Sequence, residues 1–365
     1  MRNLYWDVVK GSGVFLVLFC HTGMVLNPYL QMYLLSLFFF VAGYFYNFKY
    51  NAEPCRYIAR KLENLWLPTV RYAMVFLLLH NVLLYAGFYT DRQLTEGISI
   101  LNNNAYPVYE LKDFIWRAFR CTALLELEEL PSALWFLPMM FFDLLILCCS
   151  LNLYDKVKKY SKLLASLAVA AIWCGIYLSG TLLIRTGMNL DWHMQVGMVL
   201  LAPVVTGLAY RRWQDKIPGK SFLPAAGLCF IVAVYHVTGI HVELSQNQII
   251  SPVIFPLVTT AGFAFHLGMS HLCMKSEMLV RFFALVSKHG LFIIATHFFA
   301  FRLVSLLLIK MHNLPMEWLP AFPCIGFPIQ HGTWWIFYVA GGVLIPVIMA
   351  EAGNYIWRNI RSLNK

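Results

Sequence analysis

Ten apolar runs, each long enough to cross a lipid bilayer, dominate this sequence. A transmembrane helix needs roughly 20 mainly apolar residues to cross about 30 Å of hydrocarbon. The runs cover residues 8–27, 30–48, 65–88, 133–151, 161–184, 193–210, 222–239, 250–271, 288–310 and 333–357. Only 13% of the residues are charged, against roughly 25% in soluble domains. We therefore predict an all-α, polytopic membrane protein with about ten transmembrane helices.

The distribution of basic residues predicts how the chain is oriented. If the N-terminus is cytoplasmic, the inner segments hold 20 of the 28 Lys and Arg residues and the outer loops hold six. Because cytoplasmic loops are enriched in Lys and Arg, both termini are predicted to be cytoplasmic. The same bias explains the net charge of +10, so we expect the lipid bilayer as a partner and no nucleic acid. A multi-pass protein of the plasma (inner) membrane is predicted.

The runs leave room for one membrane-embedded domain, residues 1–365. The outer loop 89–132 contains YELKDFIWRAFRCTALLELEE, which is typical of an amphipathic helix at the membrane interface. A second outer loop, 311–332, is rich in Pro and aromatic residues and predicts a re-entrant or capping segment. The first run could instead be a signal peptide, but Asp7 and Lys10 interrupt it and no small-residue cleavage site follows before the next run.

Cysteines and histidines give little sign of a disulfide or a metal. The nine cysteines form no CxxC motif, although Cys121 and Cys324 are both predicted to lie outside and could pair. His266 and His271 are five residues apart, whereas a two-histidine site on a helix needs a spacing of about four. We expect no metal.

The first run, DVVKGSGVFLVLFCH, carries ionisable residues at both ends. Lys10 and His21 are eleven residues apart, which on a helix leaves them within roughly 20° of one another with a rise of about 16 Å. Asp7 lies within about 40° of the same stripe and can pair with Lys10 at i, i+3. One face of the helix is therefore predicted to carry a charged pair at the cytoplasmic end and an imidazole about halfway across the membrane.

This stripe predicts a helix that lines a cavity. Ionisable residues inside a span are costly and usually face the bundle interior or a water-filled space. The GSG of residues 11–13 would let a neighbouring helix or a ligand approach the backbone closely. With an ordinary pKa of about 6.5, a histidine can accept a proton at cytoplasmic pH, so His21 is a candidate general base. Alternatively, His21 only bonds a backbone carbonyl across the bundle.

A basic cluster follows the second run on its cytoplasmic side. In CRYIARKLENLWLP, Arg56, Arg60 and Lys61 fall on one helix, at i, i+4 and i+5, close to the membrane. Such a cluster suits a polyanionic ligand, because guanidinium groups match phosphate oxygens. Ordinary basic flanking of a span explains the cluster equally well.

At these positions the chain resembles the acyltransferase 3 family of integral membrane acyltransferases, with its sugar O-acetylase branch nearest. DVVKGSGVFLVLFCH is similar to the family's first-helix signature, a basic residue followed after ten residues by His. The other similar segments are LSLFFFVAGYFYN (35–47), RKLENLWLP (60–68), ALWFLPMMFF (133–142) and GLFIIATHFFAF (290–301), which ends shortly after His297. These five segments occur in the family's order across nearly the whole chain. Three departures are YLLS at 33–36 where the branch has FHMP, Ala42 in place of Ser, and Asn64 in place of Arg.

The resemblance implies transfer of an acyl group, expected to be acetyl, from cytoplasmic acetyl-CoA to a hydroxyl of a cell-surface glycan or lipid-linked sugar. The expected roles are His21 as general base, Asp7 orienting Lys10, and Lys10 holding CoA or stabilising developing charge. Arg56, Arg60 and Lys61 would bind the CoA phosphates. A covalent acyl-histidine is a less favoured route.

The acceptor side and the class of protein leave alternatives. Trp135 and Phe136 lie near the outer end of a span close to Glu128 and could bind a sugar, although interfacial aromatic residues are also the ordinary membrane belt. His297 has a family counterpart but no role that its sequence position explains. The alternative function is a proton-coupled exporter or flippase of a glycan or lipid, in which His21 and Asp7 relay protons.

Overall fold

The structure, a computed structural model, describes residues 3–94, 97–101, 103–216, 222–240, 242–326 and 333–363. The chain divides into two compact units, each built from several stretches of sequence. The first unit comprises Met1–Asn27, Val70–Leu134 and Cys273–Lys365, and the second comprises Pro28–Thr69 and Trp135–Leu272. Each unit is described by itself.

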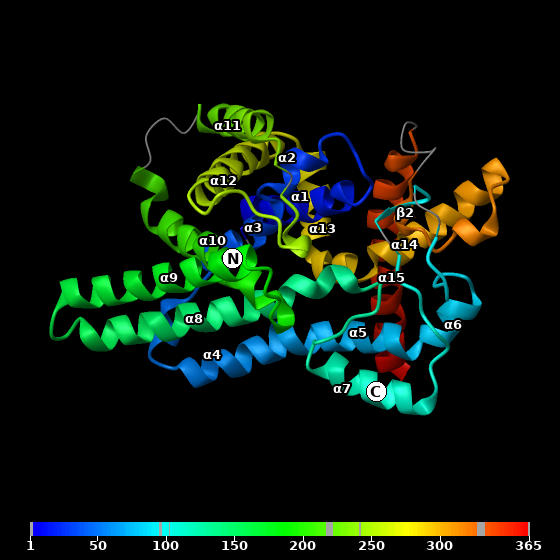
Figure 1. Ribbon diagram of the computed structural model, residues 1–365, viewed down its shortest axis with the longest axis horizontal. Coiled ribbons are helices and arrows are strands. Elements are labelled where there is room, and N and C mark those ends of the chain that lie inside the picture. Colours follow the sequence, from blue (N-terminus) through cyan, green and yellow to red (C-terminus); the bar gives the residue numbers. More distant parts are fainter. Residues whose placement is uncertain are drawn as a thin grey trace. The chain divides into compact units, whose positions relative to one another are not determined.

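Both units are mainly helical (Figure 1). The first unit contains α1 (Leu4–Cys20), most of α5 (Leu67–Leu78), α6 (His80–Tyr85), β1 (Ser99–Leu101), α7 (Leu111–Thr122), α13 (Glu277–Lys288), α14 (Gly290–His312), β2 (Phe322–Ile325) and α15 (Trp334–Leu363). The second unit contains most of α2 (Asn27–Gln31), then α3 (Leu34–Tyr44), α4 (Pro54–Lys61), α8 (Phe136–Val157), α9 (Lys162–Arg185), α10 (Met194–Trp213), α11 (Leu223–Thr238) and α12 (Ile254–Cys273). A π-helical segment, Leu62–Trp66, follows α4 directly.

Five of the predicted spans coincide with helices that are long and apolar enough to cross a membrane. They are Ser132–Val157, Lys162–Arg185, Asp191–Lys216, Gly290–His312 and Trp334–Ile356. The prediction of a helical membrane protein is confirmed to this extent. The number of ten spans and the cytoplasmic termini stay predictions.

The other five runs form shorter or less apolar helices. The run 8–27 is helical only to Cys20, and the run 65–88 is divided at Leu79 between α5 and α6. Helices α3 and α11 have 11 and 16 residues, fewer than the roughly 20 that a full crossing needs. Helix α12 has the length, but His266 and His271 lower its hydropathy.

Glycines allow the closest helix contacts in both units. A Cβ atom on Gly11 of α1 would lie 2.0 Å from the Phe283 carbonyl oxygen of α13, so the two backbones touch there. This confirms the close approach predicted from the GSG of residues 11–13. In the second unit, a Cβ atom on Gly43 of α3 or on Gly207 of α10 would lie 1.9 Å from a carbonyl oxygen of the other helix. Helices α8 and α9 run side by side in the same unit (Figure 1).

The two predicted outer loops of the first unit are joined by strands. β1 from residues 89–132 pairs antiparallel with β2 from residues 311–332, with Leu101 opposite Phe322. The predicted amphipathic helix is α7, whose inner residues Phe114 and Cys121 pack with Ala73 and Leu77 of α5. Its other face exposes large apolar side chains, namely Leu111, Ile115, Trp116 and Phe119, as a helix lying at a membrane interface would.

Candidate active site

Helix α1 carries the predicted charged pair near its first turn. The Asn3 side chain caps the helix by accepting the Tyr5 N–H at 3.1 Å. The Lys10 Nζ lies 3.1 Å from Asp7 Oδ1, and Ser287 of α13 donates its hydroxyl to the same oxygen at 3.4 Å. The Asp7 side chain is 5% exposed and the Lys10 side chain 39%. The carboxylate is therefore held in the interior while the ammonium group stays accessible.

His21 lies at the opposite end of α1, where it caps the helix. Its backbone N–H donates to Val17 O and Leu18 O, and the helix is continuous from Leu4 to Cys20. The predicted rise of about 16 Å between Lys10 and His21 therefore applies. The structure brings Asp7 and Lys10 together and keeps His21 on the same helix, as the spacing predicted.

The surroundings of the half-buried His21 are mainly aromatic and come from distant parts of the sequence. Its ring centroid lies 5.1 Å from that of His297 and 4.8 Å from that of Phe298, both on α14. The Cys324 thiol of β2 donates to the His21 carbonyl oxygen, with an S–O distance of 3.7 Å. Burial raises the pKa of the Cys324 thiol to about 12, so the thiol keeps the hydrogen that it donates.

Cys121 and Cys324 are both free thiols. The pairing that the sequence left open between them is therefore not formed. Cys121 packs instead in the core between α5 and α7.

The basic cluster lies in the second unit, on α4. Arg56 is exposed and pairs with Glu53 at 2.9 Å, and the Arg60 guanidinium donates to the Tyr50 hydroxyl at 2.5 Å. The Lys61 ammonium lies 5.3 Å from the centre of the Tyr57 ring. Burial, and to a smaller extent Arg60, lowers the pKa of Lys61. A bound polyphosphate would offset the repulsion between the Lys61 ammonium and the Arg60 guanidinium, because it places negative charge beside both cations.

The residues predicted for the acceptor are divided between the units. Glu128 lies in the first unit, is buried, and its Oε2 is 3.0 Å from His80 Nδ1. Trp135 and Phe136 lie in the second unit, where Phe136 is buried against Phe38 and Trp135 packs edge-on against His193. Their role in acceptor binding stays a prediction.

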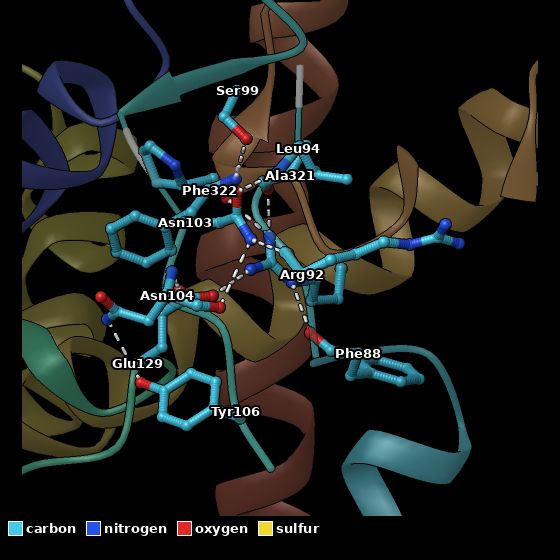
Figure 2. A network of polar contacts seen from close by, with 12 residues as sticks. Phe88, Arg92, Leu94, Ser99, Asn103, Asn104, Tyr106, Glu129, Ala321 and Phe322 are labelled. Atoms are coloured by element: carbon cyan, nitrogen blue, oxygen red, sulfur yellow. Dashed lines mark hydrogen bonds and ion pairs between the residues drawn. The ribbon is translucent and has the colours of Figure 1, made fainter. Parts of the chain in front are cut away.

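A buried ion pair joins the outer segments of the first unit (Figure 2). Arg302 of α14 is fully buried and donates from Nη2 to Glu129 Oε1 at 2.7 Å. The Asn104 N–H donates to Glu129 Oε2 at 2.8 Å, and both of these residues are labelled in Figure 2. The same guanidinium donates to the carbonyl oxygens of Phe88, Ala321 and Pro323. The network therefore anchors the start of β2, the residue before the 89–132 loop and Glu129 near the end of that loop to one helix.

Burial raises the pKa of the Glu129 carboxyl group. The Arg302 guanidinium and the Asn104 N–H oppose this effect and lower the pKa, because both favour the ionised form. Burial outweighs these two partners, so the pKa of Glu129 stays above its ordinary value in surroundings that exclude water.

Sequence reasoning assigned no role to His297 and did not pair Arg302 with Glu129. A signal for the pair existed, because a charged residue inside a span needs a partner and Glu129 lies in an outer loop. No comparable signal linked His297 to His21. His21 lies in the first third of the chain and His297 in the last third, with 275 residues between them. Their contact depends on how α1 packs against α14.

The apolar helices, five of them long enough to cross a membrane among the described residues, are those of a membrane protein. The family profile described as an acyltransferase domain, that of acyltransferase 3, matches residues 3–351. The chain therefore belongs to the acyltransferase 3 family and is a membrane acyltransferase. Neither the curated proteins nor the solved structures include a match to it.

Proposed function

We propose that this protein transfers an acetyl group from cytoplasmic acetyl-CoA to a hydroxyl of a cell-surface glycan or lipid-linked sugar in the plasma (inner) membrane. The observation that carries the proposal is the polar stripe of α1 in a member of an acyltransferase family. On this helix, Lys10 is accessible and ion-paired at one end, and His21 stands about 16 Å further along.

His21 acts as the general base in this proposal. The acceptor O–H proton passes to a ring nitrogen of His21 while the hydroxyl oxygen bonds to the thioester carbonyl carbon. The C–S bond then breaks, and the proton on His21 passes to the departing thiolate to give free CoA. An attack of this kind needs a neutral imidazole in contact with the acceptor.

Lys10 holds the CoA end of the donor. The rise of about 16 Å to His21 is too long for direct stabilisation of charge at the thioester, and it is of the order of an extended pantetheine arm. Asp7 positions the ammonium group, since its carboxylate is buried and fixed by Ser287. Arg56, Arg60 and Lys61 are proposed to bind the CoA phosphates.

Isothermal titration of acetyl-CoA into the purified full chain in detergent tests the donor site. We expect Lys10→Ala to weaken binding by about tenfold or more, because a charge-assisted contact contributes roughly 1.5–3 kcal/mol. Lys275→Ala is the matched control, an exposed lysine on a predicted cytoplasmic segment. Absence of binding by the wild type at millimolar acetyl-CoA would contradict the proposed donor.

Acyl transfer by the His21→Ala variant tests the base. Membrane vesicles containing the full chain receive radiolabelled acetyl-CoA, and label is measured in the lipid and glycan fraction. We expect a decrease of about 10²–10⁴-fold, with no comparable decrease for the exposed His271→Ala. Activity within about tenfold of the wild type would remove His21 from this role. The exporter alternative predicts instead that substrate crosses sealed vesicles without CoA.

A further inference from the structure

His297 is a second histidine at the candidate active site. Its side chain is fully buried on α14, and its ring lies edge-on to His21 at 71° with centroids 5.1 Å apart. Phe298 packs against both imidazole rings, and its ring centroid lies 4.8 Å from that of His21 and 4.0 Å from that of His297. Phe322 of β2 packs on Phe298 at 4.8 Å. The two imidazoles therefore meet inside an aromatic enclosure of the first unit.

The hydrogen bonds of His297 identify its tautomer. Its Nδ1 lies 3.2 Å from Ile293 O and 3.0 Å from Ile294 O, and both contacts are hydrogen bonds. Because carbonyl oxygens only accept, Nδ1 must carry the hydrogen, and in a neutral ring Nε2 then carries the lone pair. Within the described residues, Nε2 is buried and has no hydrogen-bond partner. A buried acceptor of this kind is costly and needs an explanation.

We propose that His297 accepts, through Nε2, the ring N–H of His21 when His21 has taken the acceptor proton. This inference rests on the proposed function. As the acceptor O–H bond breaks, one ring nitrogen of His21 binds that hydrogen, and the N–H on its other ring nitrogen donates to His297 Nε2. After the C–S bond breaks, the first proton passes to the CoA thiolate and His21 becomes neutral again. His297 gains no proton overall and is a positioning residue that touches no substrate.

The geometry fits this role before substrate arrives. The two rings are in contact without a hydrogen bond, and catalytic hydrogen bonds often form fully only in the complex with substrate. His21 caps the C-terminal end of α1, after the last helical residue. His297 is fixed at Nδ1 by its own helix, so it provides a stationary acceptor.

A pair of amide variants separates this role from the anchoring of His297 to its own helix through Nδ1. In His297→Gln, Oε1 stands as many bonds from Cα as Nε2 does and supplies the acceptor. In His297→Asn, Nδ2 stands as many bonds from Cα as Nδ1 does and keeps the donor to the helix carbonyls, whereas its Oδ1 stands one bond short of the position of Nε2. A positioning role predicts that Gln retains activity and Asn loses it, whereas a role only in the Nδ1 hydrogen bonds to the helix carbonyls predicts the reverse.

The assay uses full-length protein in membrane vesicles with radiolabelled acetyl-CoA as the probe, and it measures kcat and KM for acetyl-CoA. We expect His297→Asn to lower kcat by about tenfold or more with KM unchanged, and His297→Gln to stay within about threefold of the wild type, since the base as a whole contributes roughly 10²–10⁴. Equal losses in both variants, or retention in Asn with loss in Gln, would overturn the inference.

A double-variant test separates a joint role of the two histidines from an independent one. When His297 acts only through His21, adding His297→Asn to His21→Ala lowers kcat no further, because residues that act as a unit are not additive. Multiplying effects would mean that His297 acts independently and would refute the inference. Wild-type protein that consumes no acetyl-CoA would instead overturn the proposed function itself, which is a different outcome from either of these.

Discussion

Replacing Arg302 by Met tests whether the buried ion pair holds the outer segments of the first unit together. Arg302 is fully buried, and the Glu129 side chain is 3% exposed. The substitution keeps a long apolar stem, but it removes the donors to Glu129 and to the carbonyl oxygens of Phe88, Ala321 and Pro323. A buried carboxylate would remain, with the Asn104 N–H as its remaining partner among the described residues.

The expected cost in the free energy of unfolding is about 3–5 kcal/mol, the value for removing one partner of a buried ion pair. Arg92 and Glu317 form an exposed pair at 3.5 Å with side chains 66% and 70% exposed, for which about 0–1 kcal/mol is expected. Arg302→Met and Arg92→Met are compared by equilibrium unfolding in mixed micelles, followed by tryptophan fluorescence. Equal costs for the two variants would refute the argument.

The double variant Arg302→Met with Glu129→Leu distinguishes charge from packing. Removing both charges should recover part of the loss, because no unpaired carboxylate remains buried. Recovery stays incomplete, since carbonyl oxygens that accepted from Arg302 still lack that donor. A double variant that is less stable than the single Arg302→Met would contradict the assignment of the loss to the buried charge.

The stability of the single variant Arg302→Met should depend on pH more strongly than that of the wild type. Burial raises the pKa of Glu129 in the folded state, and Arg302 lowers it, so Arg302→Met raises it further. A carboxyl group whose folded pKa lies above its unfolded value stabilises the protein below the unfolded pKa and loses that contribution as the pH rises through the folded value. The stability deficit of Arg302→Met relative to wild type should therefore be larger at pH 8 than at pH 5, by about 1.4 kcal/mol per pKa unit of added shift. A deficit that does not change with pH would be inconsistent with this account.

Two further predictions concern helix packing and the donor site. Gly11→Ala should destabilise the protein by about 1–3 kcal/mol or more, because its Cβ would meet the Phe283 carbonyl at 2.0 Å. A Cβ atom on Gly175 would meet no described atom within 4 Å beyond its own stretch of helix, so Gly175→Ala should be neutral or stabilising by up to about 1 kcal/mol. Thermal unfolding of both variants checks this contrast. Lys61→Ala should weaken acetyl-CoA binding by roughly tenfold and more than Arg56→Ala, because Lys61 is half-buried against an aromatic ring and Arg56 is exposed and paired. Titration calorimetry measures both, and a larger effect at Arg56 would contradict the assignment.

Hydropathy predicted the class of protein and several of its elements. Long apolar runs cannot be mistaken for soluble segments, so α8, α9, α10, α14 and α15 appear close to their predicted positions. Hydropathy did not predict the end of α1 at Cys20 or the interruption between α5 and α6 at Leu79. A turn inside an apolar run leaves hydropathy unchanged, so a window average does not detect it.

The polar stripe of α1 was predictable because it depends on helix periodicity alone. The positions of Asp7, Lys10 and His21 follow from 3.6 residues per turn, and the Asp7–Lys10 ion pair forms as the i, i+3 spacing predicts. Family resemblance then gave the stripe a chemistry that the spacing did not specify. The sequence by itself thus determined the membrane-embedded helical class, the family and the local arrangement on its first helix.

Only the tertiary structure decided which distant residues meet that helix. His297 lies against His21, and Arg302 pairs with Glu129, although each pair is separated by well over a hundred residues. Helix periodicity states which face a residue occupies but not which other helix covers that face. That choice depends on the packing of α1, α14 and the β1–β2 pair as a whole, where each buried polar group must find its partner through space.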